Sequence, residues 1–467
     1  MDVAREVTQL LSTGTTLMSI HIKLDQVLKL PPFWLAFAFM ALVSLPMSFV
    51  AFPITAAPLG VLPSVGIIAF ITLIMCTSIA AIAEAIVLLP PDSRPKNLHD
   101  LVIIYLGKRA GTITALAIMV IFFVVLVACA ISIVATLSAF TGWPKFFWLA
   151  LLGILILLVI SFGSIAHSLS LVAGALALLI MLAIIAALIP FIDLERILYI
   201  QLPFTDNRGL APNIWSGFLG VMILSFIGPL LLVPSATYVL PNNPEANLFI
   251  KGSLWGIIFQ AVVMVLWIFA VDSSILPAEL IGLHGTVLIK LGQITDPFIK
   301  ISGAMLVLIL PGLAAIRSAA QLGVQIRLFF VQDNQVQGQN LSLISQYLLP
   351  TIPTIVAFIL VALLIDVDKA NVSVFLSIGG ILGSSIATGI IPTMLYKAVI
   401  QKNIKPTIPL LCFFRSHLAI ILNFMFFIVV LLLYGLVIWD SIIIQIIACT
   451  IAAVAITQLL GLFSKPK

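Results

Sequence analysis

The sequence predicts an all-α polytopic membrane protein, a helical bundle of about 12 (11–12) transmembrane helices. Of its 467 residues 62% are hydrophobic and only 8% are charged, with a mean hydropathy of +1.29. Soluble domains do not have this composition. Helices and closed barrels are the two structures that span a bilayer, and the apolar runs here far exceed the alternating ten-residue strands of a barrel. A helical bundle is the remaining class.

The individual spans follow from the length of the apolar runs. A crossing needs about 20 apolar residues. The first span should serve as the insertion signal, because the N-terminal residues show no short apolar core followed by a small-residue cleavage site. One tilted or re-entrant element could replace one of the last two spans. The predicted spans are 33–60, 64–90, 112–140, 146–163, 168–191, 213–240, 248–271, 300–330, 344–365, 372–397, 416–437 and 441–462.

The positions of Lys and Arg predict the orientation. Cytoplasmic loops of membrane proteins are enriched in these residues. With the N-terminus inside, the short cytoplasmic segments hold most of them, and we expect a multi-pass protein of the inner (plasma) membrane with cytoplasmic segments at 1–32 and 463–467. The net charge of +5 is spread over loops, so no nucleic-acid partner is expected. The inside residues are Arg5, Lys23, Lys29, Arg94, Lys96, Lys108, Arg109, Lys397, Lys402, Lys405, Arg415, Lys465 and Lys467.

Two of the spans contain prolines where a continuous helix would be expected. The first reads "SLPMSFVAFPITAAPLG", with Pro46 and Pro53, and the sixth reads "GVMILSFIGPLLLVPSATYVLP", with Pro229 after Gly228. A proline inside a helix costs roughly 3 kcal/mol. Simple kinks are the alternative explanation. Two breaks about 180 residues apart nevertheless favour discontinuous helices with exposed backbone groups.

The spacing of the two breaks predicts an internal repeat. Each break opens a set of five spans, and five is an odd number, so the two sets enter the membrane in opposite directions. The predicted organisation is a first repeat at 33–191, an inverted second repeat at 213–397 and two additional helices at 416–462. Paired interrupted segments in two halves are the best sequence indication of a transporter's binding site.

Several segments resemble one family. "FVAFPITAAPLGVLPSVGIIAFITLIMCTSIAAIAEAI", "NLHDLVIIYLGKRAG", "LSFIGPLLLVPS" and "LSIGGILGSSIATGIIPTMLYKAV" are similar to the first two spans, the loop before the third span, the sixth span and the tenth span of amino acid/polyamine/organocation (APC) superfamily transporters. The amino acid/auxin permease and aromatic amino acid permease branches are the most similar, and Pro53 and Gly60 match their proline and glycine seven residues apart.

This resemblance implies a five-plus-five inverted-repeat bundle of the leucine-transporter type, alternating access, and coupling to a proton or sodium gradient. In the family a Gly-x-Gly before the proline leaves backbone amides free for a substrate carboxylate. Here Pro46 and Ser48 occupy those positions, although proline has no amide hydrogen and serine adds a side chain. The resemblance therefore supports the fold more directly than it supports an amino acid substrate.

Half-helix ends present free N–H and C=O groups, so the residues of the two breaks are the candidate substrate site. The apolar side chains of the second break favour a small solute with an apolar portion. Ser384 and Ser385 could line the pathway, although small residues also permit tight helix packing. The candidates are Ser48, Phe49, Val50, Ala51, Phe226, Ile227 and Gly228, with Pro46, Pro53 and Pro229 as the helix breaks.

Two charged residues lie inside predicted spans. Arg317 is near the middle of the eighth span, where a charge costs about 2.5–3.5 kcal/mol on insertion scales. The resemblance implies that the eighth span packs against the broken first span, where sodium-coupled members of the fold hold an ion. We therefore interpret Arg317 as a fixed positive charge that replaces this sodium ion, or as a group that binds an anionic part of the solute. A structural ion pair with Glu84 is the alternative. Glu84 could relay protons or be a paired carboxylate near the interface.

The other polar residues of the spans carry less information. Asp272 lies at a span end and is interpreted as an ordinary interfacial group. The four cysteines show no metal-ligand or disulfide spacing and are interpreted as small buried apolar residues, with no metal and no cofactor implied. They are Cys76, Cys129, Cys412 and Cys449.

The leading functional interpretation is a secondary active transporter of a small organic solute, most simply an amino acid or related compound, with the proton favoured over sodium as coupling ion. No GxxxxGK[ST] loop for ATP is present. The alternative is a non-transporting receptor or scaffold that keeps the fold. An enzyme is not expected, because the histidines are scattered and no catalytic cluster stands out.

Overall fold

Every element that the structure describes is a helix, and none is a strand. Among these helices, eight are long and apolar enough to cross a membrane, and four shorter apolar helices have 10–17 residues. This confirms the predicted all-helical membrane class. The computed structural model describes residues 30–45, 47–162, 167–198, 217–242, 246–281, 283, 285–294, 297–335, 349–366, 371–401, 408, 411–438 and 442–464.

Most of the long helices run without interruption, including two separate helices in the last apolar region. A further stretch, Val372–Gln401, is continuous but contains a π-helical segment, η7 (Gly379–Ile390), between α18 (Val372–Ile378) and α19 (Ile391–Gln401). The uninterrupted helices are α4 (Val61–Val87), α6 (Lys108–Thr141), α7 (Lys145–Phe162), α8 (His167–Leu188), α13 (Asn247–Ser274), α16 (Pro297–Gln335), α17 (Leu349–Asp366), α21 (His417–Leu433) and α22 (Ile442–Ser464).

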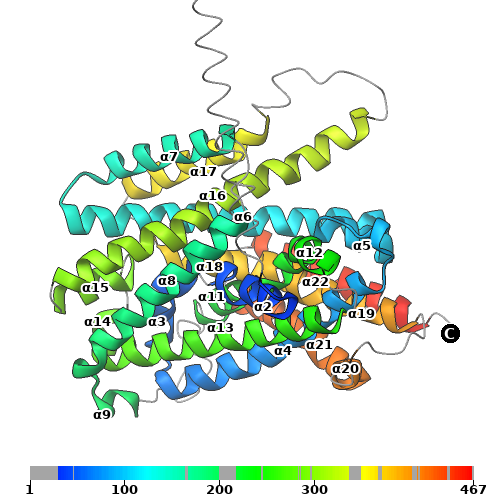
Figure 1. The fold of residues 1–467 in the computed structure, drawn as a ribbon, viewed down its shortest axis with the longest axis horizontal. Helices are drawn as coiled ribbons and strands as arrows, with labels where there is room; N and C mark the ends of the chain where they lie inside the picture. The colour runs from blue at the N-terminus through cyan, green and yellow to red at the C-terminus, as the bar shows by residue number, and fades with distance from the viewer. Residues whose placement is uncertain are drawn as a thin grey trace, which may run out of the picture.

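The two proline-interrupted segments lie in the middle of the bundle. In Figure 1, α11 (Phe218–Ser225) and α12 (Gly228–Val239) lie among the long helices, α2 (Pro32–Ala38) packs on α13, and α4 and α13 run together along one edge. In the α11–α12 segment 89% of the most apolar stretch is buried, against 28% in α8. Irregular backbone at membrane depth is tolerated only inside protein, so this burial keeps the breaks away from lipid.

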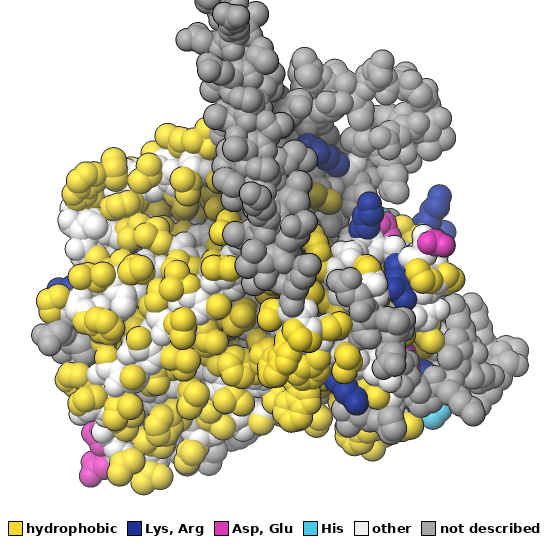
Figure 2. All heavy atoms as spheres, in the orientation of Figure 1, with side chains coloured by type: hydrophobic (Ala, Val, Ile, Leu, Met, Phe, Trp, Pro, Cys, Tyr) yellow, Lys and Arg dark blue, Asp and Glu magenta, His cyan; other side chains and the backbone are white. Residues whose placement is uncertain are grey.

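The outer surface is apolar. Figure 2 shows hydrophobic side chains over most of the visible face, with Lys and Arg gathered toward the end where α5 (Leu98–Leu106) and α19 lie. Large apolar side chains such as Leu179 and Ile301, each 64% exposed, are typical of a surface that contacts lipid. The prediction that all four cysteines are buried is wrong for Cys412 and Cys449, which are exposed. A residue in an apolar run of a membrane protein can face the lipid, so its position in the run does not show that it is buried in the protein.

One close contact between backbones fixes α11 against η7. A Cβ atom added to Gly380 would lie 1.8 Å from the carbonyl oxygen of Gly220, and one added to Gly220 would lie 2.4–2.7 Å from atoms of Ser377. Small residues at such crossings allow helices to approach closely in membranes. This favours the packing interpretation of the run that contains Ser384 and Ser385.

Replacing Gly380 with alanine should destabilise the protein by about 1–3 kcal/mol or more, because the added methyl group forces two backbones apart. Gly66→Ala is the matched control. A Cβ at Gly66 meets nothing within 4 Å, and alanine is favoured over glycine in a helix by about 1 kcal/mol. Unfolding of both variants in mixed detergent micelles measures the difference. Equal stability of the two variants would contradict the contact.

Candidate functional site

The first break separates two short helices. The helical stretch Pro32–Val43 ends in the π-helical turn η1 (Phe39–Val43), and the chain resumes as η2 (Met47–Val50) and α3 (Phe52–Ala56). Pro53 lies in the first turn of α3, where a missing N–H costs nothing, so it starts this helix rather than kinking one. Of the predicted site residues here, Phe49, Val50 and Ala51 are buried at 0–2% exposure. Pro46 and the side chain of Ser48 lie outside the described residues.

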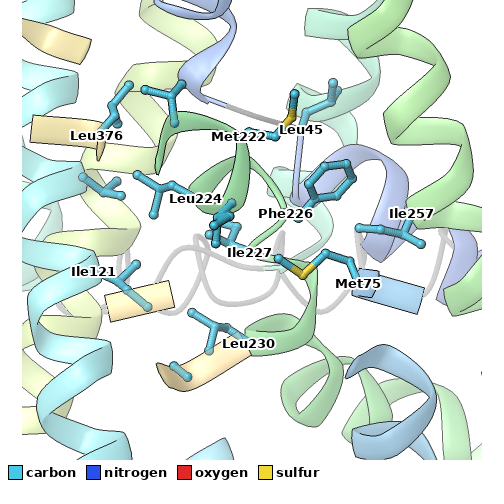
Figure 3. Close-up of a cluster of buried hydrophobic side chains, with 14 of the residues drawn as sticks. Leu45, Met75, Ile121, Met222, Leu224, Phe226, Ile227, Leu230, Ile257 and Leu376 are labelled. Carbon is cyan, nitrogen blue, oxygen red and sulfur yellow. The ribbon is translucent and has the colours of Figure 1, made fainter. Parts of the chain in front are cut away.

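The second break has the same construction. α11 ends at Ser225, Phe226 and Ile227 leave the helical path, and α12 restarts at Gly228 with Pro229 in its first turn. A Cβ at Gly228 would lie 3.1 Å from Cδ1 of Ile257 and 3.4 Å from Sδ of Met40, so α12 begins in close contact with its neighbours. In Figure 3 this break lies in a cluster of buried hydrophobic side chains from several helices.

Gln260, near the middle of α13, connects the two breaks. The hydroxyl of Ser44, which follows the first half-helix, donates to Oε1 of Gln260 at 2.7 Å. The side-chain amide of Gln260 donates to the carbonyl oxygen of Ser225, the last residue of α11, at 2.7 Å. The three residues are 0–2% exposed. The Gln260 side chain therefore binds a polar group at the end of the first half-helix of each break: the hydroxyl of Ser44 and the carbonyl of Ser225. Carbonyl groups at a helix end lack helical partners.

A second contact from α13 reaches the backbone of the first break. Trp267 donates its indole N–H to the carbonyl oxygen of Phe49 at 2.8 Å, and the two rings meet edge to face with centroids 5.7 Å apart. Trp267 is seven residues after Gln260, which places both side chains on one face of the helix. α13 thus holds both ends of the first break.

Arg317 of α16 lies at the first break. Its Nη1 donates to the carbonyl oxygen of Val43, the last residue of η1, at 3.0 Å. A cation beside a helix C-terminus is stabilised by the unpaired carbonyls and the helix dipole. The possible pairing of Arg317 with Glu84 is wrong, because Glu84 binds a different arginine.

Glu84 of α4 forms a buried ion pair with Arg415. Arg415 donates from Nε to Oε2 of Glu84 at 3.1 Å and from Nη2 to Oε1, and the Glu84 side chain has no exposed surface. Arg415 precedes α21, so the pair joins α4 to the C-terminal helices. Nearby, the hydroxyl of Tyr105 donates to the carbonyl oxygen of Ala85 at 2.9 Å. Burial, and to a lesser extent the charge of Glu84, raise the pKa of Tyr105. Glu84 matches the paired-carboxylate interpretation.

The remaining sequence candidates are placed apart from this network. Ser384 and Ser385 lie in η7 and are fully buried, with the hydroxyl of Ser385 contacting the carbonyl oxygen of Gly380 at 3.4 Å. Asp272 lies near the end of α13, as predicted, but its side chain is only 4% exposed and so is not an ordinary solvated group. Within the described ranges no three His, Cys, Asp or Glu side chains gather where they could hold a metal ion.

A separate hollow of about 360 Å³ lies between α8 and α16. Its lining is apolar and largely outward-facing, and the hydroxyl of Ser302 donates to the carbonyl oxygen of Phe298. The hollow therefore offers no polar group directed at a solute and is not the proposed site. The lining residues are Leu179, Ile180, Ala183, Phe298, Ile301, Ser302 and Met305.

Sequence reasoning missed Gln260 and Trp267. Gln260 carries no charge and sits in the run "LWGIIFQAVVMVLWIF", whose hydropathy hides it. A polar side chain at the centre of a span is itself a signal, because it is costly there unless it has a partner. That signal could have found Gln260 but not its two partners.

The likeness to known proteins is confined to solved structures, since no family model and no curated protein matches the chain. The Eremococcus coleocola manganese transporter, in complex with an aromatic bis-isothiourea substituted compound, is similar over 92% of this chain and 94% of its own. Its sequence is 11% identical and the TM-score is 0.56.

A Na+-coupled sialic acid symporter in a substrate-bound outward-open state is similar over 98% of this chain and 97% of its own. Its sequence is 15% identical and the TM-score is 0.56. At these identities the likeness concerns the fold. The chain therefore has a fold similar to that of these membrane transporters over nearly its full length.

Proposed function

We propose that the protein is a secondary active transporter that moves a small organic solute by alternating access. The observation that carries this proposal is the link through Gln260 between two interrupted helices in the middle of the bundle. Such breaks leave backbone groups that can bind a solute or an ion. The likeness in fold to two transporters supports the same conclusion.

The proposed solute site is formed by the two breaks. Its members are the predicted residues Ser48, Phe49, Val50, Ala51, Phe226, Ile227 and Gly228, to which we add Gln260. Its described members are all buried, and their side chains are at most 7% exposed, so solute entry requires the bundle to open. Apolar side chains beside the backbone polar groups of the two breaks suit an amino acid or a related compound with an apolar portion.

We propose a proton as the coupling ion, with Arg317 as a fixed positive charge. The guanidinium group at the carbonyl oxygen of Val43 supports this role, because a cation already satisfies the half-helix end where a sodium ion would otherwise be needed. Glu84, held by Arg415, supplies the second fixed charge.

The proposed architecture is the inverted repeat of 33–191 and 213–397, followed by the two helices of 416–462. The matching construction of the two breaks, each resumed with a proline in the first turn, supports it. The gathering of Lys and Arg toward the α5 end supports an inner-membrane orientation with this end and both termini in the cytoplasm.

One observation favours a second function. Pro46 and Ser48 stand where the similar family keeps glycines, so a receptor or scaffold that retains the transporter fold is the alternative. Reconstitution separates the two functions. A panel of amino acids, amines and organic anions is offered to proteoliposomes under a proton gradient and, separately, a sodium gradient. Uptake driven by protons is expected. Solute binding without uptake would support the receptor, and sodium dependence would contradict the role of Arg317.

Gln260→Leu should lower uptake at least tenfold and stability by about 1–3 kcal/mol, because it leaves the Ser225 carbonyl buried without its amide donor. The Ser44 hydroxyl keeps its contact with the carbonyl oxygen of Met40. Gln325→Leu is the matched control. Gln325 is also buried, at 2% exposure, and its Oε1 has no hydrogen-bond partner. Uptake and unfolding are measured on both variants. If Gln325→Leu lowers uptake as much as Gln260→Leu, the link between the breaks is not what matters.

A further inference from the structure

The structure describes one carboxylate whose position the proposed function does not explain. Asp272 lies two residues before the end of α13 and is 4% exposed. Neither Oδ1 nor Oδ2 has a hydrogen-bond partner. Glu84 is equally buried, yet both of its oxygens accept from Arg415. The two carboxylates therefore differ in what compensates their burial.

An ionised carboxylate is not stable in the surroundings of Asp272. Removing an unpaired charge from water costs far more than a folded protein can supply, and in practice such a group is neutralised. A carboxylic acid is neutral and needs no cation beside it. The buried, unpartnered position thus fits the protonated form of Asp272.

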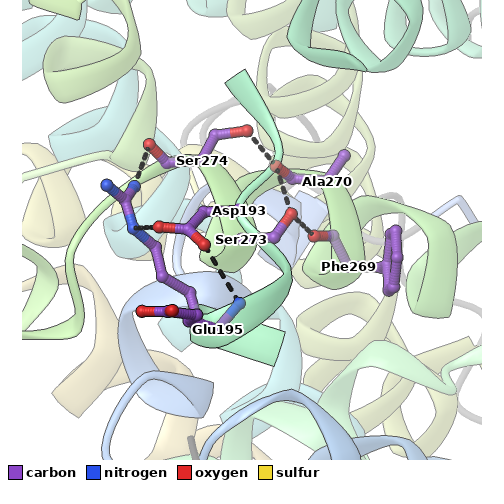
Figure 4. A network of polar contacts seen from close by, with 7 residues as sticks. Asp193, Glu195, Phe269, Ala270, Ser273 and Ser274 are labelled. Atoms are coloured by element: carbon purple, nitrogen blue, oxygen red, sulfur yellow. Dashed lines mark hydrogen bonds and ion pairs between the residues drawn. The ribbon is translucent and has the colours of Figure 1, made fainter. Parts of the chain in front are cut away.

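The polar groups beside Asp272 are already engaged with one another. Figure 4 shows the hydroxyls of Ser273 and Ser274 directed at backbone carbonyls one turn earlier, including the 2.6 Å contact from Ser274 to Ala270. Arg196 donates to the carbonyl oxygen of Ser274 at 2.7 Å and pairs with Asp193 at 3.2 Å. The cation of this network, Arg196, is therefore bound to acceptors other than Asp272.

The elements that pack most closely on α13 supply little further charge. α2, η1, α3, α12 and the turn η4 (Ile189–Phe191) contain no acidic, basic or histidine residue. The charged or titratable residues on the elements packed against α13 are Glu84 of α4, which is paired, the thiol of Cys76 on α4, the phenol of Tyr238 on α12, His167 of α8, whose side chain is outside the described residues, and Glu195 and Arg196 of α9 (Leu194–Ile197).

We propose that the carboxyl group of Asp272 binds and releases the proton that drives transport. In the described arrangement the group is buried as the neutral acid. When the end of α13 opens to water, the O–H bond breaks, the proton passes to water and the carboxylate is hydrated. α13 also carries Gln260 and Trp267, so a movement of this helix couples proton release to the two breaks. This inference rests on the proposed transporter function.

Asp272→Asn tests the proton in transport. Asparagine has nearly the same shape and is neutral, so folding should be retained, but it cannot release a proton. In proteoliposomes we expect solute exchange at zero gradient to continue, while accumulation driven by a proton gradient falls at least tenfold. Glu279→Gln is the matched control, since Glu279 is an exposed carboxylate seven residues further along. Undiminished proton-driven accumulation in Asp272→Asn would overturn the inference, whereas no solute movement by the unaltered protein would overturn the transporter function instead.

Infrared difference spectra test the same carboxyl group without any solute. The carbonyl stretch of a protonated carboxylic acid should be present in the unaltered protein at neutral pH, lost in Asp272→Asn and kept in Glu279→Gln. Identical spectra for the unaltered protein and Asp272→Asn would contradict the proton site. Loss of the band on adding sodium would show that Asp272 binds sodium rather than a proton, and would overturn the inference as well.

Discussion

Replacing Arg317 with glutamine should abolish proton-driven uptake while the protein is still expressed and folded. The guanidinium group donates to the carbonyl oxygen of Val43 at the end of the first half-helix. Glutamine removes the charge and shortens the side chain, so the half-helix end loses its cation. Folding is retained because removing a charge from a span also removes a cost of about 2.5–3.5 kcal/mol. We expect uptake to fall at least tenfold, which corresponds to about 1.4 kcal/mol.

Two further variants separate the charge from its position. Arg317→Lys keeps the charge but offers a point charge in place of the planar fork, so it should retain part of the uptake. Lys300→Gln removes a charge from the same helix at an exposed position and should leave uptake unchanged. Normal transport by Arg317→Gln, or appearance of sodium dependence in Lys300→Gln, would sink the proposed role of Arg317.

The parts of the molecule that sequence predicts well depend on local pattern. Apolar runs located the helices because each must be long enough to cross a bilayer. Pro53 and Pro229 locate the two breaks, because proline restricts its own turn and its neighbours wherever it occurs. The sequence predicts the positions of these two prolines better than their role. Both prolines begin a half-helix in the structure, where a first-turn proline is tolerated.

The parts that sequence could not predict depend on contacts between distant residues. Gln260 and Ser44 are 216 positions apart, and Arg415 and Glu84 are 331 apart. Periodicity carries no information about such pairs. In this chain the alternation of buried and lipid-facing residues is also hidden, because both faces are apolar. The position of Asp272 in its apolar run therefore predicts an ordinary interfacial group, although packing buries its side chain.

Breaking the pair of Glu84 and Arg415 should have the largest effect on stability. Removing one partner of a buried ion pair leaves an uncompensated charge and typically costs about 3–5 kcal/mol. The carboxylate of Glu84 is fully buried and the Arg415 side chain is only 13% exposed. Arg415→Gln should therefore destabilise the protein by several kcal/mol, measured by unfolding in mixed detergent micelles. Glu84→Gln should do the same from the opposite side.

The comparison with an exposed pair makes this prediction specific. Asp193 and Arg196 form an ion pair at 3.2 Å with side chains 43% and 27% exposed. Exposed pairs are worth about 0–1 kcal/mol, and asparagine can still accept the hydrogen bond from the amide of Glu195, so Asp193→Asn should cost no more than that. A double variant, Glu84→Gln with Arg415→Gln, removes both charges and should recover much of the loss. If the two single losses simply add, the charges do not stabilise each other, and the join between α4 and the C-terminal helices depends on apolar packing instead.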